Sequence, residues 1–241
     1  HKEYRRQRQM CIRDRARADS LGGFDEEDLK STEIGYKYKS SDNRLLINTA
    51  YYQYDYTNQQ QQIIVVNSSG ALAGQTFNAG SSDMTGFELE TKYAVTDNVQ
   101  LDFSYYGAET EFKSFEITDV RPPLSFTGNK MNYSPERSYN IGMTVFSDDD
   151  SSVFTMSYSH KDSYFMDPSN RFVSEQPSYG LLNMSYIKDF SDNLQMKLFC
   201  TNCTDQLYIT QVTTFAVQFG GGGRNYYANG QRVGLEMTYS F

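Results

Sequence analysis

Several residue types that form common functional sites are scarce in this chain of 241 residues. Its two His, one of them at position 1, leave little for a histidine-based metal or catalytic site. Three Cys are too few for a disulfide scaffold. No stretch approaches the roughly 18–20 consecutive apolar residues that a membrane-spanning helix needs. In contrast, 20 Tyr and 16 Phe are too many for a disordered chain, so the sequence predicts a folded protein.

Charge is distributed unevenly along the chain. Residues 1–17 carry a net charge of about +5, which leaves about −13 for the rest of a chain whose total is −8. A basic arm can bind nucleic acid or a membrane surface, but this one lacks apolar periodicity and precedes an acidic body, so we expect no nucleic-acid partner. Its string EYRRQRQMCIRDR resembles a translated sequencing-adapter remnant. We therefore interpret residues 1–17 as a non-native or disordered arm and residues 18–241 as the domain.

The rest of the chain is dominated by alternation of apolar and polar residues. Val99, Leu101 and Phe103, for example, alternate with Gln100 and Asp102. This period of two is typical of strands whose two faces meet different environments. Nine such strands are expected, at residues 31–39, 43–56, 84–95, 98–112, 139–145, 154–158, 182–186, 194–200 and 233–241.

Short and long connections alternate between these strands. The short ones, at 40–42, 96–97, 147–151 and 191–192, are built from Ser, Asp, Asn and Thr, which satisfy their own turn backbones. The long ones lie at 57–83, 113–136, 161–177 and 205–225. This asymmetry is typical of transmembrane β-barrels, which have short periplasmic turns and long external loops. We therefore predict an all-β, antiparallel, up-and-down transmembrane β-barrel.

The odd number of strands predicts that the barrel is incomplete. Bacterial single-chain barrels have an even number of strands, and an open sheet edge in lipid leaves backbone groups unpaired. The nine expected strands should therefore close against strands that are not present here. Alternation alone does not exclude a secreted β-sandwich binding module, which would bury the apolar face between two sheets.

Blocks of sequence, all in the expected order, resemble TonB-dependent outer-membrane receptors. They are STEIGYK (31–37), the run 44–56, GFELE (86–90), LNMSY (182–186), LFCTNCTDQLY (198–208) and GLEMTYSF (234–241). The resemblance implies a 22-stranded barrel around a plug, of which this chain supplies about the last nine strands and no plug. Cys200 and Cys203 depart from the pattern, because the family usually has apolar residues there.

The same resemblance implies a function. The family sits in the outer membrane of Gram-negative bacteria and imports scarce small-molecule ligands, most often ferric siderophores but also cobalamin, haem or oligosaccharides. Energy comes from the TonB–ExbB–ExbD complex acting through the plug. The implied partners are therefore outer-membrane lipid, the missing strands and plug, that complex and the ligand, with no cofactor and no enzymatic activity. A passive porin or a barrel enzyme is the alternative.

Candidate site residues lie mainly in the connections. Arg121, Arg171 and Arg224 are the loop cations that could meet an anionic ligand. Cys200 and Cys203 have CxxC spacing but no further ligands for zinc, so they are either apolar fillers at a strand end or an extracellular disulfide.

The last predicted strand has a role of its own. Its apolar positions resemble the signal that the outer-membrane assembly machinery reads, and we expect that reading to occur by strand addition along an exposed edge. We expect the true C-terminus here, with the signal formed by Val233, Leu235, Met237, Tyr239 and Phe241.

Overall fold

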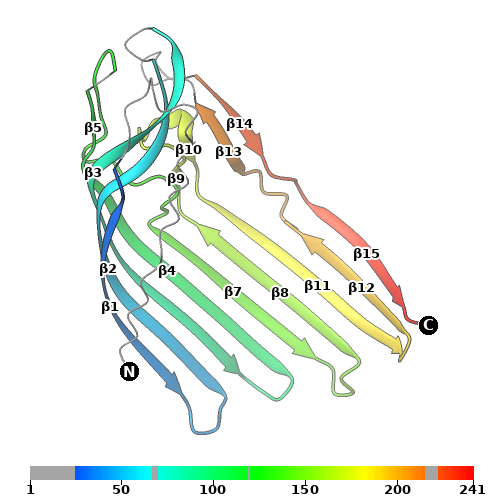
Figure 1. The fold of residues 1–241 in the computed structure, drawn as a ribbon. Coiled ribbons are helices and arrows are strands. Elements are labelled where there is room, and N and C mark those ends of the chain that lie inside the picture. The colour runs from blue at the N-terminus through cyan, green and yellow to red at the C-terminus, as the bar shows by residue number, and fades with distance from the viewer. Residues whose placement is uncertain (1–24, 67–69, 119, 215–221) are drawn as a thin grey trace.

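The main element of the protein is one nine-stranded antiparallel sheet, seen in a computed structural model that describes residues 25–66, 70–118, 120–214 and 222–241. Every strand pairs with its neighbours in the chain, and the sheet is open between its edge strands β1 and β15 (Figure 1). The predicted meander of nine strands is therefore confirmed, whereas the predicted arm at 1–17 lies outside the described residues. The strands are β1 (Asp28–Lys39), β2 (Leu45–Val66), β3 (Leu72–Ala94), β4 (Val99–Ser114), β7 (Arg137–Phe146), β8 (Ser152–Lys161), β11 (Tyr179–Ser191), β12 (Leu194–Thr201) and β15 (Arg232–Tyr239).

The register gives the sheet one apolar and one polar face. Because side chains alternate along a strand, residues that are direct cross-strand partners share a face. One row of partners across the sheet is Leu45, Tyr93, Leu101, Met143, Met156, Met184, Cys200 and Val233. The row displaced by one residue is Leu46, Lys92, Asp102, Gly142, Ser157 and Asn183. No described residue covers the apolar face, on which Ile34 is 72% and Ile141 50% exposed.

Two of the short turns have the same construction, at 40–45 and 147–152. In each, the hydroxyl of the first residue, Ser40 or Ser147, donates a hydrogen bond of 2.5 Å to the carboxylate two positions on. The same hydroxyl accepts the N–H of the sixth residue at 2.9 Å. The fourth residues, Asn43 and Asp150, have φ of 60° and 55°, a conformation that Asn and Asp adopt more readily than most residues. The Ser- and Asp-rich composition thus gives tight turns whose backbone groups are hydrogen-bonded by side chains of the same turn. We call this edge of the sheet the turn end.

The opposite edge, which we call the loop end, corrects one prediction. Residues 57–66 and 72–83 are not a loop, because β2 and β3 continue through them as a paired hairpin out to Val66 and Leu72. The pairing skips Asn58, whose φ of 57° marks an irregularity where the hairpin leaves the sheet. We call residues 57–83 the arm.

The arm has its own hydrophobic core. The connection at 113–136 contains β5 (Glu116–Ile117) and β6 (Leu124–Ser125) and packs against the arm. The ring of Phe115 lies 5.2 Å from that of Phe112 and 5.1 Å from that of Phe126, measured between centroids. The buried members, which we call the arm core, are Ile63, Val65, Ala79, Phe112, Phe115, Ile117, Val120, Phe126 and Met131.

The remaining long connections also lie at the loop end and are hydrogen-bonded to other connections. They contain β9 (Tyr164–Phe165), η1 (Phe172–Ser174), β10 (Glu175–Gln176), β13 (Ile209–Thr214) and β14 (Gly223–Tyr227). Asn129 Nδ2 donates to the Pro168 carbonyl at 2.8 Å, and the Ile209 N–H donates to Gln176 Oε1 at 2.5 Å. The described residues contain no helix with the length and apolarity needed to cross a membrane.

Candidate functional site

Four tyrosines gather where the polar face meets the loop end, and we call them the tyrosine cluster: Tyr133, Tyr164, Tyr179 and Tyr208. The rings of Tyr179 and Tyr208 stack with centroids 4.6 Å apart and planes 5° apart. Tyr164 is hydrogen-bonded to Tyr179, and its ring lies 6.3 Å from that of Tyr133. Burial raises the pKa of the Tyr164 hydroxyl above its usual value, so the hydroxyl is neutral at pH 7. The cluster offers aromatic faces and neutral hydroxyl groups to a ligand.

A second group of tyrosines lies on the same face at β2 and β4. Tyr52 is 3% exposed and stacks on Tyr54, with centroids 4.8 Å apart. Its ring covers Gly86, where an added Cβ would lie 2.4 Å from ring atoms. Tyr52 is therefore a packing residue, whereas Tyr54 and Tyr106 keep part of their surface exposed toward the polar side.

A shallow hollow on the polar face, which we call the upper hollow, connects these groups. Glu88, Tyr106, Ser138, Lys161 and Tyr179 are successive direct partners across β3, β4, β7, β8 and β11. The row therefore ends in the tyrosine cluster. Its lining includes Glu88, Glu90, Ser104, Tyr106, Ser138, Asn140, Ser159 and Lys161, with Tyr105, Tyr139 and His160 from the row displaced by one residue. It presents two carboxylates and one ammonium among neutral hydroxyl and amide groups.

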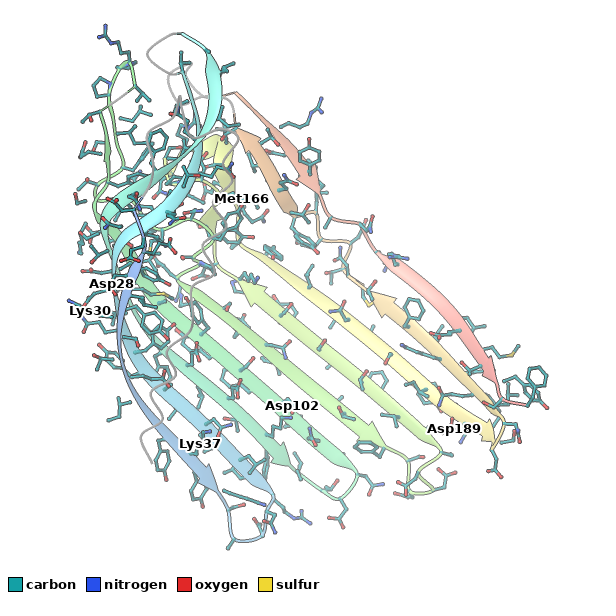
Figure 2. The ribbon with its side chains drawn as sticks, viewed as in Figure 1. Asp28, Lys30, Lys37, Asp102, Met166 and Asp189 are labelled. Atoms are coloured by element: carbon teal, nitrogen blue, oxygen red, sulfur yellow. A yellow bond between two sulfur atoms is a disulfide. The ribbon has the colours of Figure 1, made fainter. Side chains whose placement is uncertain are left out.

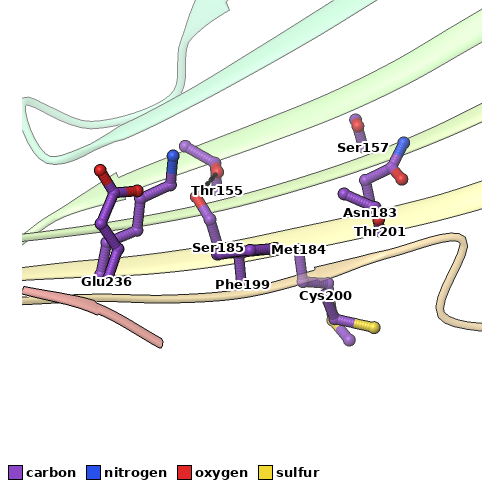
Figure 3. A pocket seen from close by; sticks show the side chains of 10 residues that line it. Thr155, Ser157, Asn183, Met184, Ser185, Phe199, Cys200, Thr201 and Glu236 are labelled. Carbon is purple, nitrogen blue, oxygen red and sulfur yellow. Dashed lines mark hydrogen bonds between the residues drawn. The ribbon is translucent and has the colours of Figure 1, made fainter. Parts of the chain in front are cut away.

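A second hollow lies on the polar face of β8, β11, β12 and β15 (Figure 3). Thr155 Oγ1 and Ser185 Oγ are hydrogen-bonded at 2.7 Å, and Lys197 lies directly opposite Glu236 in the register. Figure 3 shows the side chain of Cys200 on the other side of the sheet from Asn183 and Ser157. This part of the polar face is therefore lined mainly by short neutral side chains.

The comparisons with known proteins decide the family. A sequence model described as TonB-dependent receptor-like β-barrel matches residues 13–203. The chain belongs to this family. A search of curated protein sequences found no matching relative.

Solved structures of the family share the fold. The siderophore receptor PiuA from Acinetobacter baumannii matches 90% of this chain with a TM-score of 0.71 and 20% identity. The ferric yersiniabactin uptake receptor FyuA from Yersinia pestis matches 89% with a TM-score of 0.70 and 18% identity. The ferripyoverdine receptor of the outer membrane of Pseudomonas aeruginosa matches 89% with a TM-score of 0.62 and 16% identity. This chain spans only 29%, 30% and 27% of those chains, so it corresponds to part of such a barrel.

The three predicted ligand-contacting arginines stand on separate connections of the receptor barrel. Arg121 is exposed between β5 and β6, and Arg224 is exposed on β14 opposite Thr213. Arg171 lies within its own loop, 3.5 Å from the Asp167 carboxylate and 2.8 Å from Ser169 Oγ. Their contact with a ligand stays a prediction. The tyrosine cluster was missed because its members come from four segments that only the sheet register and the loop packing bring together.

Cys200 and Cys203 are joined by a disulfide at the end of β12, with Cα atoms 5.6 Å apart. Asn202 between them is 6% exposed and has φ of 49°. Its amide donates to the Gln206 carbonyl at 2.9 Å and accepts the Gln206 N–H at 2.9 Å. This turn therefore fixes the start of the connection to β13.

The predicted assembly signal lies on the edge strand β15 and just beyond it. Its apolar residues alternate onto the apolar face, and Phe241 packs edge-on against Tyr239 with centroids 5.2 Å apart. Four of its members pair with β12: Val233 with Cys200, Leu235 with Leu198, Met237 with Met196 and Tyr239 with Leu194. Recognition by the assembly machinery stays a prediction.

Proposed function

We propose that this chain forms part of the wall of an outer-membrane receptor that takes up a ferric siderophore by TonB-dependent transport. The observation that carries the proposal is the polar face, which belongs to a TonB-dependent receptor barrel and ends in the tyrosine cluster. Aromatic faces with hydroxyl groups suit the compact organic ligands that enclose ferric iron. Receptors of this kind, PiuA and FyuA, share the fold.

The two faces of the sheet support a position in the outer membrane of a Gram-negative bacterium. The uncovered apolar face fits lipid, the polar face fits the lumen, and the loop end would face the outside. Open edges at β1 and β15 would cost several kcal/mol for each unpaired backbone group in lipid. We infer that further strands of the same receptor close the barrel around a plug, on which the TonB–ExbB–ExbD complex acts. In such a barrel Glu88 and Glu90 are lumen-facing charges with no catalytic role.

Uptake by the complete receptor that carries this chain tests the proposal. We expect a strain without its own siderophore receptors to accumulate ⁵⁵Fe from a ferric siderophore when it expresses this receptor. Accumulation should stop when TonB is deleted. Uptake that continues without TonB would show a passive porin and would contradict the proposal.

A double variant connects uptake to the site. Replacing Tyr164 and Tyr179 by Ala removes two ring contacts and should weaken siderophore binding by about 10- to 100-fold, since each lost aromatic contact is worth about 0.5–1.5 kcal/mol beyond burial. Tyr93→Ala, on the apolar face, is the matched control and should leave binding unchanged. Equal affinities of the double variant and the control would place the ligand elsewhere.

A further inference from the structure

Four cations at the loop end already face carboxylates of the same chain, whereas Arg121 and Arg224 are exposed on the outer connections. Arg137 Nε lies 2.8 Å from Asp162, and Lys130 is paired with Glu136. An ammonium or guanidinium that is paired in this way gives little net attraction to an approaching anion. The four pairs are Lys113 with Glu111 at 2.5 Å, Lys130 with Glu136, Arg137 with Asp162 at 2.8 Å and Arg171 with Asp167 at 3.5 Å.

The upper hollow carries the opposite sign. Glu88 and Glu90 face it together with a single ammonium group, that of Lys161. Its other polar residues are Ser, Asn and Tyr, together with His160, whose ring lies 3.2 Å from the Asp162 carboxylate. In the arm, residues 57–82 contain no Asp, Glu, Lys, Arg or His, and the carboxylate of Asp83 lies 3.9 Å from the Lys113 ammonium. The lining of the upper hollow, with two carboxylates and one ammonium, is therefore weakly negative.

We propose that the substrate of this receptor is a ferric chelate without net negative charge, of the neutral trihydroxamate class rather than the trianionic triscatecholate class. This inference rests on the proposed function, siderophore uptake, and specifies the net charge of the siderophore. Tyrosine and serine hydroxyls with the Asn140 amide bind the carbonyl and N–O oxygens of such a chelate through neutral hydrogen bonds. A trianion about 7 Å from one uncompensated carboxylate is disfavoured roughly 20-fold in water by Coulomb repulsion.

Binding of two probes to the complete receptor in detergent tests the charge of the ligand. The probes are a ferric trihydroxamate and a ferric triscatecholate, with dissociation constants measured by titration at low and high salt. We expect the trihydroxamate to bind at least about tenfold more tightly at low salt, and its affinity to change little with salt. The triscatecholate should gain affinity as salt screens the carboxylates.

A charge variant tests whether Glu88 and Glu90 cause the difference in affinity between the two chelates. The double variant Glu88→Gln with Glu90→Gln should tighten triscatecholate binding about tenfold and leave trihydroxamate binding within about twofold. Retained trihydroxamate binding also shows that the variant is folded. Glu109→Gln is the control for position, because it removes one carboxylate charge from the other face of the sheet, on β4 at the loop end.

The outcomes separate this inference from the proposed function. Tighter binding of the triscatecholate than of the trihydroxamate by the unmodified receptor, or a double variant that behaves like Glu109→Gln, would overturn the inference while siderophore uptake stands. Binding of neither chelate, together with no TonB-dependent iron uptake, would overturn both.

Discussion

The arm and the sheet below it belong to one chain but bury their apolar residues in opposite ways. In the arm core, Phe112 and Phe115 are fully buried among other side chains. In the sheet, apolar residues such as Ile34, Ile141 and Val233 are half or more exposed, on a face that none of the residues described by the structure covers. Figure 2 shows this difference as side chains crowded around the arm and spread singly over the sheet.

The difference teaches which solvent each region is built for. A segment surrounded by water buries its apolar side chains in a core, because exposing apolar surface to water is unfavourable. A barrel wall in lipid instead has an apolar outer face that contacts the lipid and a polar inner face that lines the lumen. The irregularity at Asn58, where the arm leaves the sheet, lies close to the boundary between these two environments.

Truncation of a ring should therefore cost more in the arm than in the wall. Phe112→Ala leaves a cavity in the arm core and should destabilise it by about 3–5 kcal/mol. Phe87→Ala is the matched control, since Phe87 is 41% exposed on the apolar face and lipid can fill the space. Amide hydrogen exchange of residues 57–66 and 72–83 measures the change. Equal loss of protection in the two variants would mean that the arm core does not hold the arm.

A charge on the apolar face tests the other half of the comparison. Ile141→Arg, near the middle of β7, should destabilise the complete receptor in lipid by about 2–4 kcal/mol. Asn140→Arg places the same side chain on the polar face and should have a much smaller effect. Denaturant unfolding in lipid vesicles measures both. Similar destabilisation by the two variants would contradict the assignment of the faces.

The wall was predictable from the sequence because its two environments impose a period of two. Residues such as Leu101 and Phe103 alternate with Gln100 and Asp102, and a one-residue slip of any strand would reverse its faces. The strand ends at the turns were predictable for a local reason, since Ser and Asp satisfy turn backbones within a few residues.

The arm and the tyrosine cluster were not predictable in this way. The polar run Gln59–Gln62 shows no alternation, because the arm faces water on one side and packs only in part on the other. The tyrosine cluster depends on contacts between residues far apart in sequence, such as Tyr179 with Tyr208 and Tyr133 with Tyr164. Glu88 and Glu90 share a face because they stand two positions apart on one strand, but only the register across β4, β7 and β8 brings that face to Lys161.

Asn202 is a buried polar residue at the loop end, so its replacement can be compared with that of a buried apolar residue in the arm core. Its buried amide both donates to and accepts from Gln206, so Asn202→Ala should destabilise this turn by about 1–3 kcal/mol. Asn202→Gly relieves the positive φ but also lacks the amide, and should recover only part of that loss. Hydrogen exchange at residues 203–209 separates the two contributions. Full recovery by glycine would assign the whole effect to backbone strain.

The smallest expected effect is at the turn end, where Asp149 is exposed to solvent. Hydrogen bonds from the hydroxyls of Ser147 and Ser151 hold the pKa of its carboxyl below the usual range. Because the folded pKa is the lower one, the stabilisation is present above the unfolded pKa of about 3.9 and is lost as pH falls through the folded value. Asp149→Asn should therefore weaken protection of this turn at pH 7, and the difference from the unmodified receptor should shrink below about pH 4. A difference that stays constant down to pH 2 would show that the negative charge does not stabilise the turn, and that its backbone geometry holds the hairpin by itself.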